Sequence, residues 1–103
     1  MSGITAAGTE SRLMIERAIS ALAHEFEHRQ LPRAICIRQQ VAEGATLDEE
    51  DARFLTEMLE ILDSACALFD QHPAAIALQR GAASICDEIM TESFINAERA
   101  AES

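Results

Sequence analysis

Residues that interrupt helices are scarce in this sequence. The 103 residues include 4 glycines and 2 prolines, which is too few for a loop-rich fold or an all-β fold with many turns. Between these residues, apolar side chains recur at steps of three and four, which is the spacing of one face of an α-helix. No segment shows the strict alternation of a half-buried β-strand. The sequence therefore predicts an all-α fold.

The periodicity predicts a small bundle of about four helices. They cover approximately residues 9–30, 33–43, 46–71 and 73–99. Leu31-Pro32 kinks or breaks the first of these segments. Thr46 and Glu49 form a capping box at the start of the third helix. We expect residues 1–8 to be a flexible N-terminus and residues 9–101 to form a single helical-bundle domain.

The last predicted helix carries more apolar surface than one neighbour can cover. One stripe consists of Leu78, Ala82, Ile85 and Ile89, and a second consists of Ile76, Ala83, Met90 and Phe94. A helix that is apolar around half of its circumference contacts more than one neighbour. Because twofold dimers are the commonest soluble oligomers, we expect the second stripe to form the interface of a homodimer.

The charge of the sequence is strongly negative. Asp and Glu number 18, Lys and Arg number 8, and the net charge is −10. This excess argues against binding to nucleic acid and to anionic membranes, because both attract clusters of basic side chains. It permits a basic partner protein. The sequence also contains no apolar run long enough for a membrane span and no secretory signal, so we expect a cytoplasmic protein.

One motif suggests metal chemistry. His24-Glu25-Phe26-Glu27-His28 matches H-E-x-x-H, in which two histidines on one helix face hold zinc and the glutamate activates bound water. Glu25 and His28 also match the E-x-x-H pattern of di-iron bundles. A helical wheel places His24 and His28 on the polar face, opposite the apolar stripe that contains Phe26. This position favours a solvated pair or an interface over a peptidase site.

The segment from about residue 20 to residue 71 resembles the dimerisation and phosphoacceptor hairpin of bacterial sensor kinases. The likeness rests on His24-Glu25-Phe26 at an exposed helix position and on a second long helix that opens with Leu47-Asp48-Glu49-Glu50. The resemblance implies that His24 is a phosphoacceptor and that Glu25 assists it. The chain departs from the family pattern at Glu27-His28-Arg29, where that family has a short polar residue and proline.

The three cysteines, at positions 36, 66 and 86, include no C-x-x-C pair. We therefore expect buried, unreactive thiols instead of a disulfide scaffold or a zinc ribbon. Together, the patterns predict a small acidic bacterial module that binds itself and another protein through helix–helix contacts, without catalytic residues or a cofactor. Two alternatives stay open. One is a metal-binding helical protein that holds Zn or Fe at His24, Glu25 and His28, and the other is a phosphotransfer hairpin.

Overall fold

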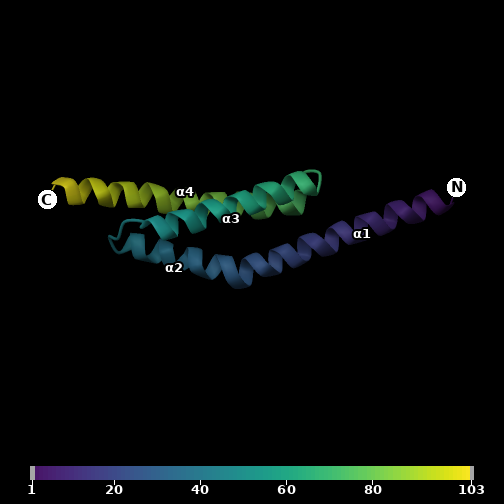
Figure 1. Cartoon of the computed structure of the whole chain (residues 1–103), viewed down its shortest axis with the longest axis horizontal. Helices are drawn as coiled ribbons and strands as arrows, with labels where there is room; N and C mark the ends of the chain where they lie inside the picture. Colours follow the sequence, from purple (N-terminus) through teal and green to yellow (C-terminus); the bar gives the residue numbers. More distant parts are fainter. Residues whose placement is uncertain (1, 103) are drawn as a thin grey trace.

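The computed structural model describes the backbone of residues 2–102 and the side chains of residues 12–102. The helices are α1 (Ser2–Glu25), the π-helical segment η1 (Phe26–Gln30), α2 (Leu31–Ala42), α3 (Glu49–Leu68) and α4 (Pro73–Glu102). They form a slender rod of 72 × 20 × 17 Å, shown in Figure 1. The all-α prediction is confirmed. Because α1, η1 and α2 follow one another without interruption, residues 2–102 form three continuous helices instead of four separate ones.

Pro32 accounts for the π-helical segment between α1 and α2. A proline has no N–H, and inside a regular α-helix its ring clashes with the carbonyl four residues earlier, here that of His28. In η1 the Leu31 N–H donates instead to the Phe26 carbonyl, five residues earlier, and this widens the turn. The helix bends at this point but continues (Figure 1). Leu31-Pro32 therefore kinks the helix and does not break it.

The first helix begins earlier than the sequence pattern predicts. α1 starts at Ser2, whereas the predicted helix starts at about residue 9. Helix propensity does not explain the difference, because Ala6 and Ala7 favour a helix whereas Gly3 and Gly8 disfavour one. The division into a flexible segment 1–8 and a domain 9–101 stays a prediction. At the other end of the chain, α4 begins at Pro73 as predicted and continues to Glu102.

The third helix begins later than predicted. Asp48 is the N-cap of α3, and its carboxylate accepts a hydrogen bond of 2.7 Å from the Asp51 N–H. Thr46 is therefore not the cap. The reason lies in Leu47, whose side chain packs against the core and whose N–H donates to the Ser93 hydroxyl at 2.9 Å. These contacts anchor Leu47 in the connection, so the helix begins after it.

Replacing Asp48 with alanine is expected to lower the free energy of unfolding by about 1 kcal/mol, because the cap satisfies an N–H that has no partner within the helix. Urea denaturation of the purified protein measures this change. Thr46→Ala is the matched control, and we expect it to change stability by less than about 0.5 kcal/mol. A larger loss of stability in Thr46→Ala than in Asp48→Ala would show that Thr46 is the cap.

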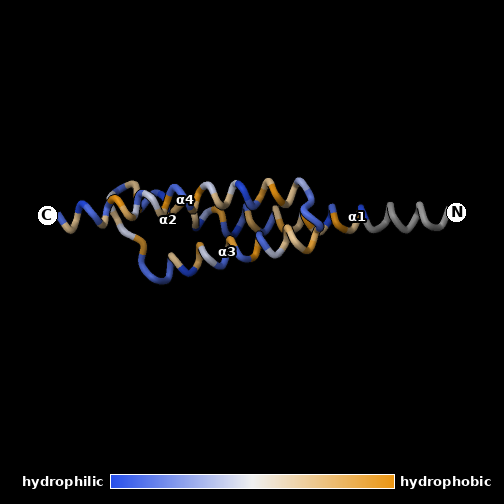
Figure 2. The backbone as a smooth tube through the Cα atoms, turned by 90° about the horizontal axis from the view of Figure 1, so that it is seen from above, coloured by the Kyte–Doolittle hydropathy of each residue, from blue (hydrophilic) through white to orange (hydrophobic). Residues whose placement is uncertain are grey.

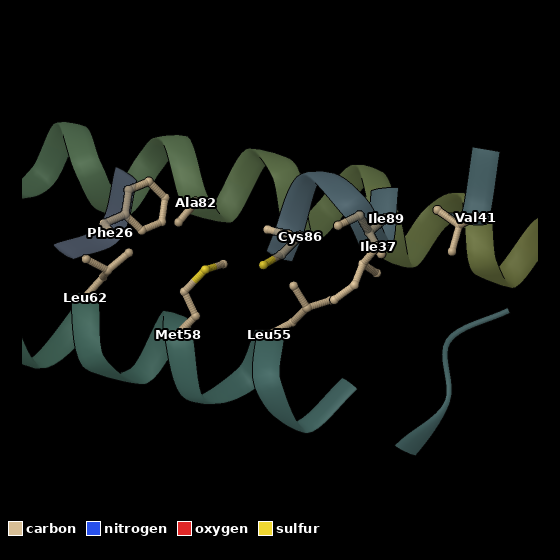
Figure 3. Close-up of a cluster of buried hydrophobic side chains, with 10 residues drawn as sticks. Phe26, Ile37, Val41, Leu55, Met58, Leu62, Ala82, Cys86 and Ile89 are labelled. Carbon is tan, nitrogen blue, oxygen red and sulfur yellow. The ribbon is translucent and has the colours of Figure 1, made fainter. Parts of the chain in front are cut away.

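The core lies where α4 packs against both α2 and α3. Figure 3 shows side chains from η1, α2, α3 and α4 meeting in one cluster. Its buried members are Phe26, Ala34, Ile37, Val41, Leu55, Met58, Leu62, Ala82, Cys86 and Ile89. Leu78 and Ile85 are partly buried against this cluster, so the first stripe of α4 is confirmed as a core stripe. Along the helices in Figure 2, hydrophobic residues alternate with hydrophilic ones, as expected for amphipathic helices.

A buried asparagine ties the end of α2 to α4. The Asn96 side chain is 6% exposed, and its Nδ2 donates to the Val41 carbonyl at 2.7 Å and to the Ala45 carbonyl at 2.8 Å. The last carbonyls of a helix have no partner within the helix, so Asn96 acts as a C-terminal cap from a neighbouring element. Gly44, with φ at +108°, turns the chain between these two carbonyls in a conformation that glycine adopts without strain.

Candidate interaction surface

The second apolar stripe of α4 is divided between the core and the surface. Ile76 is partly buried against a small cluster formed by Ile19, Cys66 and Ala75. Ala83, Met90 and Phe94 are exposed, with Met90 at 59% and Phe94 at 64% of their full accessibility. The apolar residues of this stripe that are available to a partner are therefore Ala83, Met90 and Phe94.

This exposed stretch borders a shallow open groove between α3 and α4. The residues lining the groove are Leu59 from α3 and Arg80, Ala83, Ser84, Cys86, Asp87 and Met90 from α4. We call the surface formed by Leu59, Ala83, Met90 and Phe94 the α3–α4 face. Single exposed apolar side chains are ordinary on proteins, but a set of them beside a groove is typical of a protein contact site.

Two side chains of opposite charge lie within the exposed stripe. Arg80 and Asp87 are both exposed, both line the groove, and are separated by seven positions on α4, or about 10 Å along the helix axis. Among the described side chains, neither has an ion-pair partner within 4.0 Å. Both charges are thus available to a group outside the chain.

Sequence reasoning did not include Arg80 and Asp87 in the interface, because it assigned these charged residues to a polar sector of the helix apart from the apolar stripes. The signal that would have found them is their spacing. The positions that share this side of α4 alternate in steps of four and three, and they are Ile76, Arg80, Ala83, Asp87, Met90 and Phe94. Such alternation marks one face of a helix whatever the residue type.

A second apolar groove lies where α1 meets the start of α4. It is lined by Glu16, Ile19, Ser20 and Ala23 from α1, by Ala74, Ala77 and Leu78 from α4, and by His72. Apolar surface is therefore accessible along both halves of α4.

The histidine motif lies at the junction of α1 and η1. The His24 and His28 side chains are exposed, as the helical wheel predicts, and their ring centroids are 4.2 Å apart with planes tilted by 42°. The carboxylate of Glu25 lies 3.6 Å from the guanidinium of Arg29 in an exposed ion pair. A metal ion, or His24 acting as phosphoacceptor, would have to compete with Arg29 for the Glu25 carboxylate. The phosphotransfer role of His24 stays a prediction.

Two imidazoles are fewer ligands than a zinc site in a protein uses. Structural zinc takes four protein ligands, and catalytic zinc takes three and a water molecule. Within the part of the chain that the structure describes, no three His, Cys, Asp or Glu side chains are grouped so that they could hold a metal ion. The motif does not form a peptidase-type centre there. Binding of Zn or Fe through His24, Glu25 and His28 would require ligands from a further molecule and stays a prediction.

The cysteines differ in exposure. Cys66 and Cys86 are buried free thiols, and burial raises the pKa of Cys86, which keeps that thiol protonated and unreactive. Cys36 is exposed, so the prediction of buried thiols is wrong for this residue. The reason is that Ile37 is the α2 residue directed into the core, and its neighbour is rotated by about 100° around the helix axis.

We expect a thiol reagent to modify Cys36 rapidly at neutral pH, and to modify Cys66 and Cys86 only as fast as the chain opens. Mass spectrometry of the protein after brief exposure to a maleimide measures the number of labels. Cys36→Ser should remove the fast label, and urea should expose the remaining two thiols. Rapid modification of all three cysteines in the folded protein would contradict the placement of Cys66 and Cys86.

The chain matches no protein-family model, no curated protein and no solved structure. Among the described residues, no helix combines the length and the apolar character needed to cross a membrane. The α3–α4 face is therefore interpreted from its own geometry.

Proposed function

We propose that this chain is a helical interaction module that forms a homodimer and binds a further protein, without catalysis of its own. The observation that carries the proposal is the exposure of Met90 and Phe94 on the α3–α4 face. Complete burial of one such side chain is favourable by about 1.5–3 kcal/mol. A second copy of the chain that covers this face would gain the share of that free energy that corresponds to the exposed fraction of each side chain, in both copies.

The shape of the molecule supports self-association. A rod 20 × 17 Å in cross-section has few interior positions, and chains of this size commonly gain stability by association. The net charge of −10 favours a neutral or basic amphipathic helix as the further partner. In the homodimer, burial of the apolar α3–α4 face has to outweigh the repulsion between two acidic chains. All three cysteines are free, in keeping with a reducing compartment such as the cytoplasm, where we propose that the module acts.

Sedimentation equilibrium over a range of protein concentrations tests the dimer. We expect Phe94→Ala to raise the dissociation constant at least tenfold, which corresponds to about 1.4 kcal/mol. The fold of the single chain should change little, because Phe94 is largely exposed within it. Leu68→Ala is the control, since Leu68 is 78% exposed on α3 and lies outside the α3–α4 face. A wild-type chain that stays monomeric, or an F94A variant that dimerises like the wild type, would refute the proposal.

Metal binding is a second candidate because the His24 and His28 rings lie 4.2 Å apart. Native mass spectrometry of protein purified without chelator distinguishes the two candidates. A dimer without bound metal supports the interaction module. One metal ion per chain or per dimer, lost in both His24→Ala and His28→Ala, favours a metal-binding protein instead.

A further inference from the structure

We propose that the homodimer forms by antiparallel pairing of α4 with α4 of a second copy. The twofold axis passes near Ala83 and Ser84, and Arg80 of each chain pairs with Asp87 of the partner subunit. This inference rests on the proposed dimer and specifies its geometry. It is carried by the two opposite charges that share the exposed stripe of α4 without a partner among the described side chains.

The spacing along the stripe is that of a helix–helix seam. Positions 76, 80, 83, 87, 90 and 94 alternate in steps of four and three, which is how a helix meets a second helix along its length. Four of these positions are apolar, and the other two are Arg80 and Asp87. A charge covered by a partner is costly unless an opposite charge is covered with it. The seam therefore needs a partner that supplies both complements.

The order of the charges selects the antiparallel arrangement. In a parallel pair, each Arg80 would face Arg80 of the partner subunit and each Asp87 would face Asp87 of the partner subunit, which sets like charges together. In an antiparallel pair, residues equally distant from the axis on opposite sides meet. Arg80 and Asp87 lie at equal distances from the midpoint between Ala83 and Ser84, so this arrangement forms two ion pairs at once.

The residues near the axis allow the helices to approach closely. Ala83 and Ser84, which flank the axis, are small and exposed, whereas Ala82 faces the chain's own core. Met90 and Phe94 then lie about 10 and 16 Å from the axis along the helix. At that distance each Phe94 ring is opposite the first turn of α4 in the partner subunit. Large side chains at the ends and small ones at the centre give a complementary interface.

Exchange of the two charges tests the pairing. We expect R80D and D87R each to raise the dissociation constant of the dimer about tenfold or more in sedimentation equilibrium, because each sets like charges together twice. The double variant R80D/D87R should return to within about threefold of the wild type. Both positions are exposed, so the circular dichroism of the single variants should remain helical.

D87R separates specific pairing from overall charge repulsion. It makes the chain less acidic, so it would tighten the dimer if only the net charge of −10 opposed association. The proposed pairing requires it to weaken the dimer. A D87R variant that dimerises as well as or better than the wild type, while Phe94→Ala still weakens the dimer, overturns the antiparallel pairing and leaves the proposed function intact. A wild-type monomer overturns both.

Disulfide formation between copies tests the direction of pairing independently. In a Cys36→Ser background, which removes the exposed thiol, Ala83→Cys places a thiol beside the axis and Glu98→Cys places one far from it. Mild oxidation should link the Ala83→Cys dimer efficiently and the Glu98→Cys dimer poorly. Efficient linkage through position 98 would indicate parallel pairing and overturn the inference.

Discussion

Replacing Ile89 with alanine is expected to lower the free energy of unfolding by about 2–5 kcal/mol. Ile89 is 0% exposed and belongs to the cluster in which α4 contacts α2 and α3, beside Ile37 and Leu55. Figure 3 shows Ile37 and Ile89 beside each other within the cluster, between Leu55 and Val41. The change removes apolar contacts to two helices and leaves a cavity, and a slender three-helix rod has few other layers that could compensate.

Urea denaturation measures this loss, and Ile61→Ala is the matched control. Ile61 lies on α3 with 47% of its surface exposed, so the same change in side chain should cost less than about 1 kcal/mol there. The measurement requires several protein concentrations, because a dimer raises the unfolding midpoint as concentration increases. Equal losses at positions 89 and 61 would contradict the burial of Ile89 in the core.

Apolar spacing was sufficient to predict the fold class and the core side of α4. Ala82 and Ile89 from the first predicted stripe are buried, and the helix begins at Pro73 as expected. The polar position of His24 and His28 was also predicted correctly. These properties depend on the angle of each residue around its own helix, and sequence periodicity reports that angle directly.

Features that depend on hydrogen-bond partners could not be predicted from apolar spacing. A proline at position 32 signals a missing N–H, but the signal is the same for a helix that ends and for one that widens to a π-helical turn. The cap of α3 was misplaced for a similar reason. Thr46 and Asp48 both suit an N-cap, and the contacts of Leu47 with the core and with Ser93 decide between them.

The candidate interface was predicted in part. Ile76 and Phe94 belong to the same stripe, yet Ile76 packs against the chain's own cluster and Phe94 stays exposed. A helical wheel contains no information on which neighbour covers which turn, so it could not separate the two. The spacing did place Ala83, Met90 and Phe94 on one side of α4, and the structure leaves all three exposed.

Asn96 gave no signal in the sequence, and its replacement by aspartate is expected to have the largest effect of any polar change. At neutral pH, Asn96→Asp should lower the free energy of unfolding by at least about 3 kcal/mol. The amide donates to the Val41 and Ala45 carbonyls, whereas an ionised carboxylate in the same place can donate to neither and is repelled by both. Urea denaturation at neutral pH measures the loss.

The pH dependence of Asn96→Asp separates the effect of the introduced negative charge from the effect of the lost hydrogen bonds. Burial beside two carbonyl oxygens raises the pKa of the introduced carboxyl in the folded state above its unfolded value. The folded state then binds the proton more tightly, so the loss of stability is greatest at neutral pH and shrinks as the pH falls through the raised pKa. The protonated carboxyl can donate one hydrogen bond.

Asn96→Ala, which lacks an ionisable group, should lose about 2–3 kcal/mol at every pH. An aspartate variant whose deficit relative to the wild type is the same at acidic and neutral pH would show that Asn96 is not held between these two carbonyls.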